Sequence, residues 1–241
     1  MKIFLSPSNQ RANVGAYVNS NECEQCTAIA MEAKKHLESV FDCEVIVATE
    51  SDNMKTRAQY ANSIGADVYV AIHTNAFSDK TVWGTETFYY SSDENGKKLA
   101  SALLESVGGI VGKKRKSKAN DSLIELNTPT CTRAYVEVDF HSNPERAAWM
   151  QANTELIGNT IANTIAQFME LDVKEDECKK NLEALVLDNL DEVFEILKRN
   201  INTSAKRIYR VQAGAFTALK DAEVLSQRLN DAGFANVIRY E

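Results

Sequence analysis

Three side chains of this sequence have types and positions that support acid–base or metal chemistry, and the first is His73. It follows Val68–Ile72, an apolar run that is typical of a strand buried on both faces in a parallel sheet. In open α/β sheets ligands bind just beyond the carboxyl ends of the strands, so a histidine at this place is well positioned for chemistry. A core histidine with satisfied hydrogen bonds is the alternative that position alone leaves open.

Glu22 is the second candidate. Asn21, with Glu24 three residues later, forms a capping box, which predicts that a helix begins here and continues to about Val40. A helix that follows the first strand starts at the carboxyl edge of the sheet, where His73 is also expected, so the two side chains can converge. Alternatively, Glu22 is only a capping carboxylate that interacts favourably with the helix dipole.

Glu137 is the third candidate, because it lies inside an otherwise apolar strand. Strand periodicity places it on the same face as Asp139 and His141. Val136 and Val138 are expected on the other face. A carboxylate in such a strand costs free energy unless it is paired or used, so Glu137 is the best candidate for a general base.

These side chains need a common sheet edge, and the alternation of strands and helices predicts one. It indicates an α/β fold with a mainly parallel, twisted sheet covered by helices on both faces. Strands are predicted at 2–5, 44–48, 67–73, 82–90 and 133–139, and helices at 21–40, 54–64, 97–110 and 154–169, with a further helix beginning at Pro144. A basic segment at 113–118 is predicted as a solvated loop or, alternatively, as a rim that meets an anionic polymer.

The pattern changes after residue 170. Residues 171–205 are acidic and carry a leucine-rich stripe at helical spacing, which predicts a helical connector. Residues 206–241 predict a strand, a helix and a strand, which together form a small βαβ module. The chain is therefore expected to have three parts, at 1–170, 171–205 and 206–241.

Composition and charge exclude several classes of protein. The chain of 241 residues has a net charge of -7, which argues against nucleic-acid binding because such binding relies on neutralising phosphates. No run reaches the roughly 18 apolar residues of a transmembrane helix, so no membrane partner is expected. The N-terminus enters a strand at once, which leaves no room for a signal peptide and predicts synthesis in the cytoplasm. The cysteines are odd in number and scattered, which argues against a disulfide framework.

Several short stretches occur together in a recognisable order. They are Ile29-Ala30 after Glu22, Arg57 with Ala61-Asn62, residues 71–76, residues 84–90, and Val136-Glu137-Val138 followed by residues 142–145. In these stretches, residues 1–170 resemble the zinc-dependent N-acetylmuramoyl-L-alanine amidases of the amidase 3 type. The resemblance implies one Zn2+ ion with Glu22 and His73 as ligands and Glu137 as the catalytic carboxylate. Arg57 and Asn75 are expected to bind substrate.

The first histidine ligand of that family has no counterpart here. Where the family has Asp-Pro-Gly-His-Gly after the first strand, this chain has Ser-Pro-Ser-Asn-Gln at 6–10. Gln10 can offer its amide oxygen, which binds zinc more weakly than imidazole, and we favour it as the third ligand. His141 is the alternative third ligand. His141 and Asp139 are otherwise expected to contact the residues that bind the metal. A Ser-Pro-Ser-x-Gln loop with Asp-Phe-His at the end of a later strand resembles a branch of these amidases.

The implied activity is that of a peptidoglycan hydrolase, which cleaves the amide between N-acetylmuramic acid and the L-alanine of the stem peptide with a zinc-activated water and Glu137 as general base. A cell-wall-binding protein that keeps the fold but has lost its metal is the alternative from another class. A zinc amidohydrolase of small peptides is a third. Bacterial peptidoglycan is the expected partner, reached after holin-mediated release of a phage endolysin or lytic release of a host autolysin.

The C-terminal module resembles the sporulation-related (SPOR) repeat, a unit that binds bacterial cell-wall glycan. The resemblance lies in residues 208–216 and 232–234 and covers about half of the usual two-fold unit. Half a sheet leaves an exposed edge, which proteins rarely tolerate. We therefore predict a homodimer that forms through the C-terminal modules and the connector, and sedimentation of the full chain tests this. A truncated tail packed on its own catalytic domain is the alternative.

Overall fold

The computed structural model describes residues 1–49 and 52–174, which belong to one compact unit. Most of the predicted connector at 171–205 and all of the predicted module at 206–241 lie outside the described residues. The predicted homodimer would form through these two parts, so its interface also lies outside the described residues.

A six-stranded sheet forms the centre of this unit. Its strands are β1 (Lys2–Pro7), β2 (Glu44–Val47), β3 (Val68–Asn75), β4 (Thr85–Tyr89), β5 (Lys114–Ala119) and β6 (Thr132–Phe140). They lie in the order β2-β1-β3-β6-β4-β5, and every neighbouring pair is parallel except β4 and β6. The predicted α/β class with a mainly parallel sheet is confirmed.

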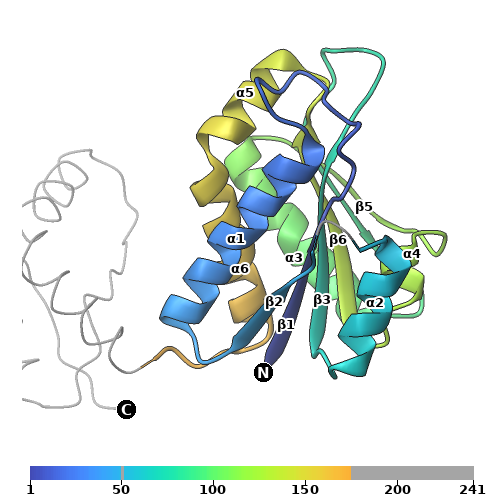
Figure 1. Ribbon diagram of the computed structural model, residues 1–241, viewed down its shortest axis with the longest axis vertical. Helices are drawn as coiled ribbons and strands as arrows, with labels where there is room; N and C mark the ends of the chain where they lie inside the picture. Colours follow the sequence, from blue (N-terminus) through green and yellow to red (C-terminus); the bar gives the residue numbers. More distant parts are fainter. Residues whose placement is uncertain (50–51, 175–241) are drawn as a thin grey trace, which may run out of the picture. The chain divides into compact units, whose positions relative to one another are not determined.

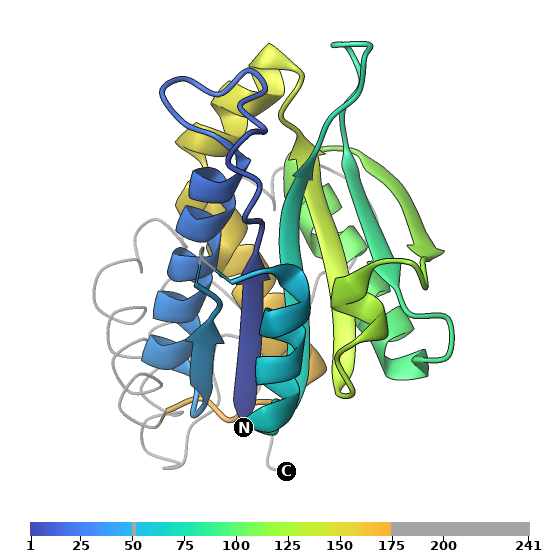
Figure 2. The ribbon, with the colours of Figure 1, turned by 45° about the vertical axis from the view of Figure 1, so that its right-hand side comes forward.

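Helices cover both faces of the sheet (Figures 1 and 2). They are α1 (Glu22–Val40), α2 (Met54–Ser63), α3 (Glu94–Val111), α4 (Ile124–Asn127), α5 (Pro144–Ala152) and α6 (Thr154–Phe168). Helices α1, α3 and α6 pack on one face over a large apolar core, and α2 and α4 lie on the other face over a smaller core. None of the helices in residues 1–49 and 52–174 is long and apolar enough to cross a bilayer.

Helix starts follow the side chains that cap them. Asn21 accepts a hydrogen bond from the backbone of Glu24, as the predicted capping box requires, and this fixes where Glu22 enters α1. Asn143 caps α5 in the same way, with Pro144 as the first helical residue. Because α1 is the next element after β1, its first turn lies at the carboxyl edge of the parallel strands.

Two elements differ from the sequence-based expectation. The basic segment at 113–118 is not a loop, because Lys114–Ala119 pairs with β4 as an edge strand. Its side chains are mostly exposed, so it lacks the apolar alternation by which strands are usually recognised. Helix α4 was not predicted either, since it has four residues and no side-chain cap.

Strand β6 is irregular where it passes the end of β3. His73 is paired with Glu137, whereas Asn75 is paired with Phe140, so β6 has one more residue than β3 over this interval. Such a bulge bends the strand and re-aims the side chains that follow it.

The bulge explains why one predicted alignment is wrong. Asp139 does not share the face of Glu137, because its carboxylate accepts hydrogen bonds from the backbone of Gly84 at 2.7 Å and from the guanidinium of Arg146 in α5. Asp139 is fully buried in these contacts. It therefore joins β6 to α5 and to the segment before β4.

The contact between α1 and α6 depends on Gly158, and this gives a stability prediction. A methyl group at this position would lie 2.8 Å from the backbone oxygen of Ile29 and 2.9 Å from the backbone nitrogen of Ala33. Gly158→Ala should therefore destabilise the protein by about 1–3 kcal/mol despite the better helix propensity of alanine. Gly109→Ala in α3 is the matched control, since nothing lies within 4 Å of the added atom. Thermal unfolding that ranks Gly158→Ala equal to or above Gly109→Ala would contradict the close packing.

Candidate functional site

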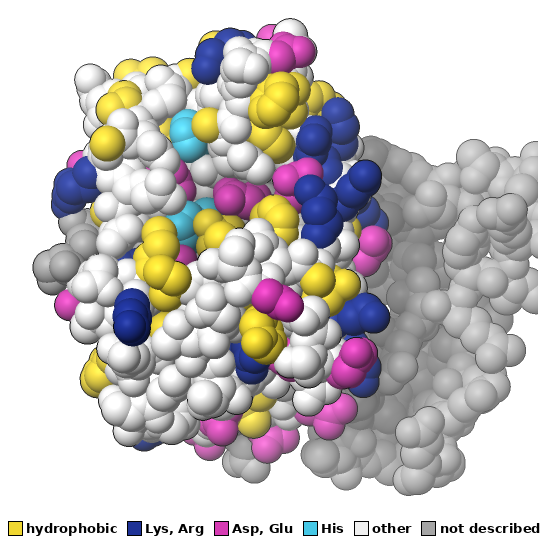
Figure 3. Space-filling model, turned by 90° about the vertical axis from the view of Figure 1, so that its right-hand side faces the viewer, with side chains coloured by type: hydrophobic (Ala, Val, Ile, Leu, Met, Phe, Trp, Pro, Cys, Tyr) yellow, Lys and Arg dark blue, Asp and Glu magenta, His cyan; other side chains and the backbone are white. Residues whose placement is uncertain are grey.

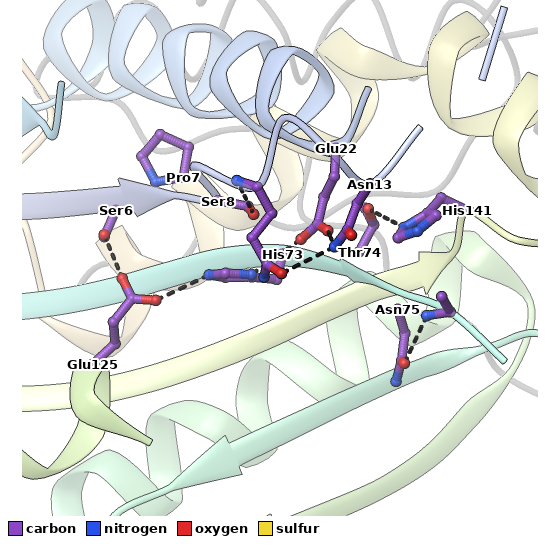
Figure 4. A network of polar contacts seen from close by, with 12 residues as sticks. Ser6, Pro7, Ser8, Asn13, Glu22, His73, Thr74, Asn75, Glu125 and His141 are labelled. Carbon is purple, nitrogen blue, oxygen red and sulfur yellow. Dashed lines mark hydrogen bonds and ion pairs between the residues drawn. The ribbon is translucent and has the colours of Figure 1, made fainter. Parts of the chain in front are cut away.

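His73 lies at the centre of a buried polar network (Figure 4). Its Nδ1 is 3.1 Å from Oε1 of Glu22, and its Nε2 is 3.0 Å from Oε2 of Glu125. All three side chains are almost completely buried. The predicted convergence of Glu22 and His73 is therefore seen in the structure, and His73 is at the same time a buried histidine with both ring nitrogens in hydrogen bonds.

Glu125 is the residue that sequence reasoning missed. It lies on α4 and accepts hydrogen bonds from the hydroxyl of Ser6 at 2.5 Å and from the hydroxyl of Tyr69 at 2.8 Å, in addition to its contact with His73. A glutamate between the apolar residues Ile124 and Leu126 was the available signal, but in so short a helix it does not stand out.

The positive charge of His73 and the negative charges of Glu22 and Glu125 stabilise one another. Burial opposes the charged form of His73, but the hydrogen bonds to Glu125 and Glu22 outweigh it and raise the pKa of the imidazole to about 10. Burial also opposes the carboxylates of Glu22 and Glu125. In both, the hydrogen bond to His73 together with its charge and the other hydrogen bonds to the carboxylate outweigh burial, so that each pKa is lowered.

Two amide side chains extend the network from Glu22 toward the surface. The amide nitrogen of Asn13 donates to Oε2 of Glu22 at 2.6 Å and lies 3.0 Å from Oε1 of Gln10. Asn13 and Gln10 both belong to the loop between β1 and α1, and Gln10 is exposed. The structure thus brings the predicted third ligand, Gln10, close to Glu22 through Asn13.

Glu137 lies beside His73 on the same face of the sheet. It is paired in register with His73 across β3 and β6, and with Glu86 across β6 and β4. Its Oε2 is buried and has no hydrogen-bond partner among the described residues. Burial raises the pKa of Glu137 to about 7; the charge of His73 opposes this rise, and Glu22 and Glu86 add to it.

His141 has a different surrounding from the one predicted. Its Nδ1 is 2.9 Å from the hydroxyl of Thr74, which also lies 3.1 Å from the hydroxyl of Tyr17. The backbone oxygen of His141 accepts a hydrogen bond from Ala16, and a Cβ at Gly15 would lie 2.3 Å from the imidazole. These contacts give His141 the role of anchoring the loop between β1 and α1.

Arg57 and Asn75, the predicted substrate-binding residues, differ in burial and in their distance from the surface of the site. Arg57 is 1% exposed, and its guanidinium donates to the backbone oxygens of Pro7 and Thr49, so it supports the loop after β1 from behind. Its burial corrects the expectation of direct substrate contact. Asn75 is half-buried at the site, with its amide nitrogen 3.4 Å from Oε2 of Glu86.

The donor set of this network partly fits a metal ion. Within residues 1–49 and 52–174, no three His, Cys, Asp or Glu side chains are arranged to hold a metal together. Two donors do lie close, since His73 Nδ1 is 3.1 Å from Glu22 Oε1, and imidazole nitrogen and carboxylate oxygen are both donor types that zinc takes in proteins. Further ligands must then include another type of group, such as an amide oxygen.

The face that carries the site has a distinct distribution of charge (Figure 3). Acidic and histidine side chains lie in a band across its middle, and lysine and arginine side chains gather beside them. Arg115 and Lys118 of β5 both form ion pairs with Glu86, which is the sheet neighbour of Glu137. A negative centre is therefore next to a positive rim.

Known proteins share this arrangement of elements. The catalytic domain of CwlV, an N-acetylmuramoyl-L-alanine amidase from Bacillus (Paenibacillus) polymyxa var. colistinus, superposes with a TM-score of 0.64 at 21% identity. The match covers 71% of this chain and 100% of that domain. At this identity the likeness shows the fold.

Two curated relatives match in sequence. The germination-specific N-acetylmuramoyl-L-alanine amidase of Bacillus subtilis (strain 168) is 26% identical over 99 residues, which are 41% of this chain and 42% of that protein. An uncharacterised 38.4 kDa protein of Clostridium perfringens is 24% identical over 196 residues, which are 80% of this chain and 52% of that protein. The chain thus spans about half the length of the curated relatives that it matches.

A sequence profile of one family covers the part of the chain that carries the site. It matches residues 3–167, which include all of the sheet except Lys2 and all residues of the network around His73. With this match over more than half of its length, the chain belongs to the N-acetylmuramoyl-L-alanine amidase family.

Proposed function

We propose that this protein is a peptidoglycan hydrolase that cleaves the amide between N-acetylmuramic acid and the L-alanine of the stem peptide. Family membership supports the reaction class. The observation that carries the proposal is the position of Glu137: it lies in register beside His73, and one of its oxygens is buried without a hydrogen-bond partner among the described residues. A carboxylate in this state is available to a reacting group.

Zinc is the metal that the family implies, and the network around His73 supports a place for it. Nδ1 of His73 and Oε1 of Glu22 would hold the ion, with the amide oxygen of Gln10 as the third ligand. When bound there, zinc supplies Lewis acidity for the scissile carbonyl and lowers the pKa of water. Since Gln10 is a neutral oxygen donor, we expect weaker metal binding than in a site with two histidines.

Glu125 prepares His73 for this role. As a ligand, Nδ1 would give up its proton and its contact with Glu22, and the hydrogen bond from Nε2 to Glu125 would keep the remaining proton on Nε2. Ser6 and Tyr69 hold the carboxylate of Glu125 in turn. The orientation of the imidazole is therefore set from the side opposite Glu22.

Glu137 takes a proton from the attacking water and passes it to the departing amine of the alanine. A general base works best when its pKa lies near the working pH, because it must both accept and release the proton. Burial raises the pKa of Glu137 to about 7, which is the direction that this role needs. Asn75 lies at the same edge beside Glu86, where its amide can bind the substrate.

Glu137→Gln tests the assignment of the base. The substitution keeps the shape and removes the proton acceptor, so hydrolysis of purified peptidoglycan should fall by about 10²–10⁴-fold. Zinc affinity, measured by calorimetry, should stay within about twofold of the parent, since the proposed ligands are intact. Glu94→Gln, at an exposed position at the start of α3, is the matched control and should keep full activity. An active Glu137→Gln protein would remove Glu137 from this role.

Glu125→Gln tests whether the carboxylate behind His73 supports the metal. Loss of such a partner typically lowers metal affinity by about 10–100-fold, and we expect this in zinc titrations of the variant. Ser6→Ala is the graded comparison, because it keeps the contact between Glu125 and His73 and removes one support of the carboxylate. Its effect should be smaller. Unchanged zinc affinity in Glu125→Gln, with circular dichroism showing a folded protein, would contradict the proposed role.

Gln10→Ala and His141→Ala decide between the two candidates for the third ligand. Gln10→Ala should weaken zinc binding by about 10-fold or more, which is at least the effect of losing a residue that holds a ligand, such as Glu125. It should change stability little, because Gln10 is exposed. His141→Ala should leave zinc affinity unchanged and lower the melting temperature, because it removes contacts with Thr74 and Tyr17. The reverse pattern would identify His141 as the ligand.

A further inference from the structure

A row of ionisable side chains leads from the site toward the edge of the sheet. His73, Glu137 and Glu86 are lateral neighbours on three adjacent strands, β3, β6 and β4. Adjacent strands are about 4.8 Å apart, so Glu86 lies roughly 10 Å from His73. The proposed reaction uses the first two members of the row and leaves Glu86 and the strand beyond it without a role.

Two cations of the edge strand β5 meet at Glu86. Nε of Arg115 donates to Oε1 of Glu86 at 3.0 Å, and Nζ of Lys118 is 3.5 Å from the same oxygen. Each cation also lies over an aromatic ring: Arg115 is 5.1 Å from the ring centre of Phe140, and Lys118 is 5.5 Å from that of Phe88. Contacts of this kind restrict where the charged groups can lie, so the pair is partly ordered before anything binds.

Arg115 and Lys118 together carry more positive charge than Glu86 neutralises. One carboxylate, Glu86, faces two cations, and both cations remain partly open to solvent while the side chain of Glu86 is 10% exposed. The bulge in β6 contributes to this arrangement, because it brings Phe140 under Arg115. The resulting basic rim, which we define as Arg115 and Lys118, is suited to an anionic group that approaches from solvent.

We propose that Arg115 and Lys118 bind a carboxylate of the stem peptide, on the amine side of the amide that is cleaved. This inference rests on the function proposed above. The acyl side of that amide is an amino sugar whose carboxyl group is already used in the amide, so it offers no anion. The peptide side carries free carboxylates.

The spacing indicates which carboxylate is bound. An extended peptide rises about 3.3 Å per residue, so three residues span the roughly 10 Å from His73 to Glu86. The bound group therefore belongs to the second or third residue after the cleaved amide. A planar guanidinium with two fixed donors is well matched to a carboxylate at that point.

The experiment compares two soluble muramoyl tripeptides that differ only in their peptide carboxylates, which are free in one and converted to amides in the other. The parent protein should cleave the acid form with a kcat/KM about tenfold higher, the effect of roughly one hydrogen bond to a charged group. Arg115→Gln/Lys118→Gln should reduce this preference to less than about twofold, mainly through KM. The ratio of the two substrates cancels any effect that the loss of the cations has on Glu137.

Lys97→Gln/Lys98→Gln is the matched control. It removes the same charge from exposed positions on α3, the helix that packs on the other face of the sheet, and should keep the tenfold preference. Equal cleavage of both tripeptides by the parent protein, or a full preference in Arg115→Gln/Lys118→Gln, would overturn the inference while leaving the proposed function intact.

Binding to Glu137→Gln provides a readout that does not need hydrolysis. Calorimetry with the same two tripeptides should show tighter binding of the acid form, and the addition of Arg115→Gln/Lys118→Gln should abolish the difference. If this holds and the parent protein cleaves neither tripeptide, the proposed function fails and the rim remains a carboxylate site. If the rim variant differs from the parent only on walls that retain anionic phosphate polymers, the occupant is such a polymer and the inference is wrong.

Discussion

The site depends on an imidazole that is buried between two carboxylates. Charged groups cannot be buried without partners, and His73 satisfies this constraint with Glu22 on one side and Glu125 on the other. The three residues come from β3, α1 and α4, which are far apart in the sequence. Holding them together requires the first turn of α1 to reach the end of β3 and requires α4 to cover the opposite face. The parallel sheet provides both conditions, because its strands end at a common edge.

The sequence predicted the parts of the site that lie in regular elements. Glu22 could be placed because a capping box marks the start of α1. His73 and Glu137 could be placed because the first follows an apolar strand and the second is an acid inside one. Glu125 was missed because α4 is too short to give a periodic signal. The position of Asp139 was predicted wrongly because a bulge shifts the alternation of β6 by one residue, and no local pattern announces it.

The same reasoning explains the outcome for the basic segment and for Arg57. An edge strand exposed on its outer side does not need apolar residues, so β5 was predicted as a loop although its lysines and arginine were noted. Arg57 was expected to bind substrate on the basis of the family resemblance; its side chain is instead buried, and the backbone carbonyls of Pro7 and Thr49 accept its hydrogen bonds. In both positions tertiary pairing, which acts between distant segments, decides the local environment.

The partner that orients His73 comes from α4 and not from the loop between β1 and α1. The hydrogen bonds that fix Glu125 come from Ser6 in β1 and from Tyr69 and His73 in β3, and among the described residues none comes from that loop. Residues 8–14 therefore reach the imidazole only through Glu22, whose carboxylate accepts a hydrogen bond from Asn13. The imidazole thus has two supports of different origin, so a change in the loop would loosen its Glu22 side and leave its Glu125 side held.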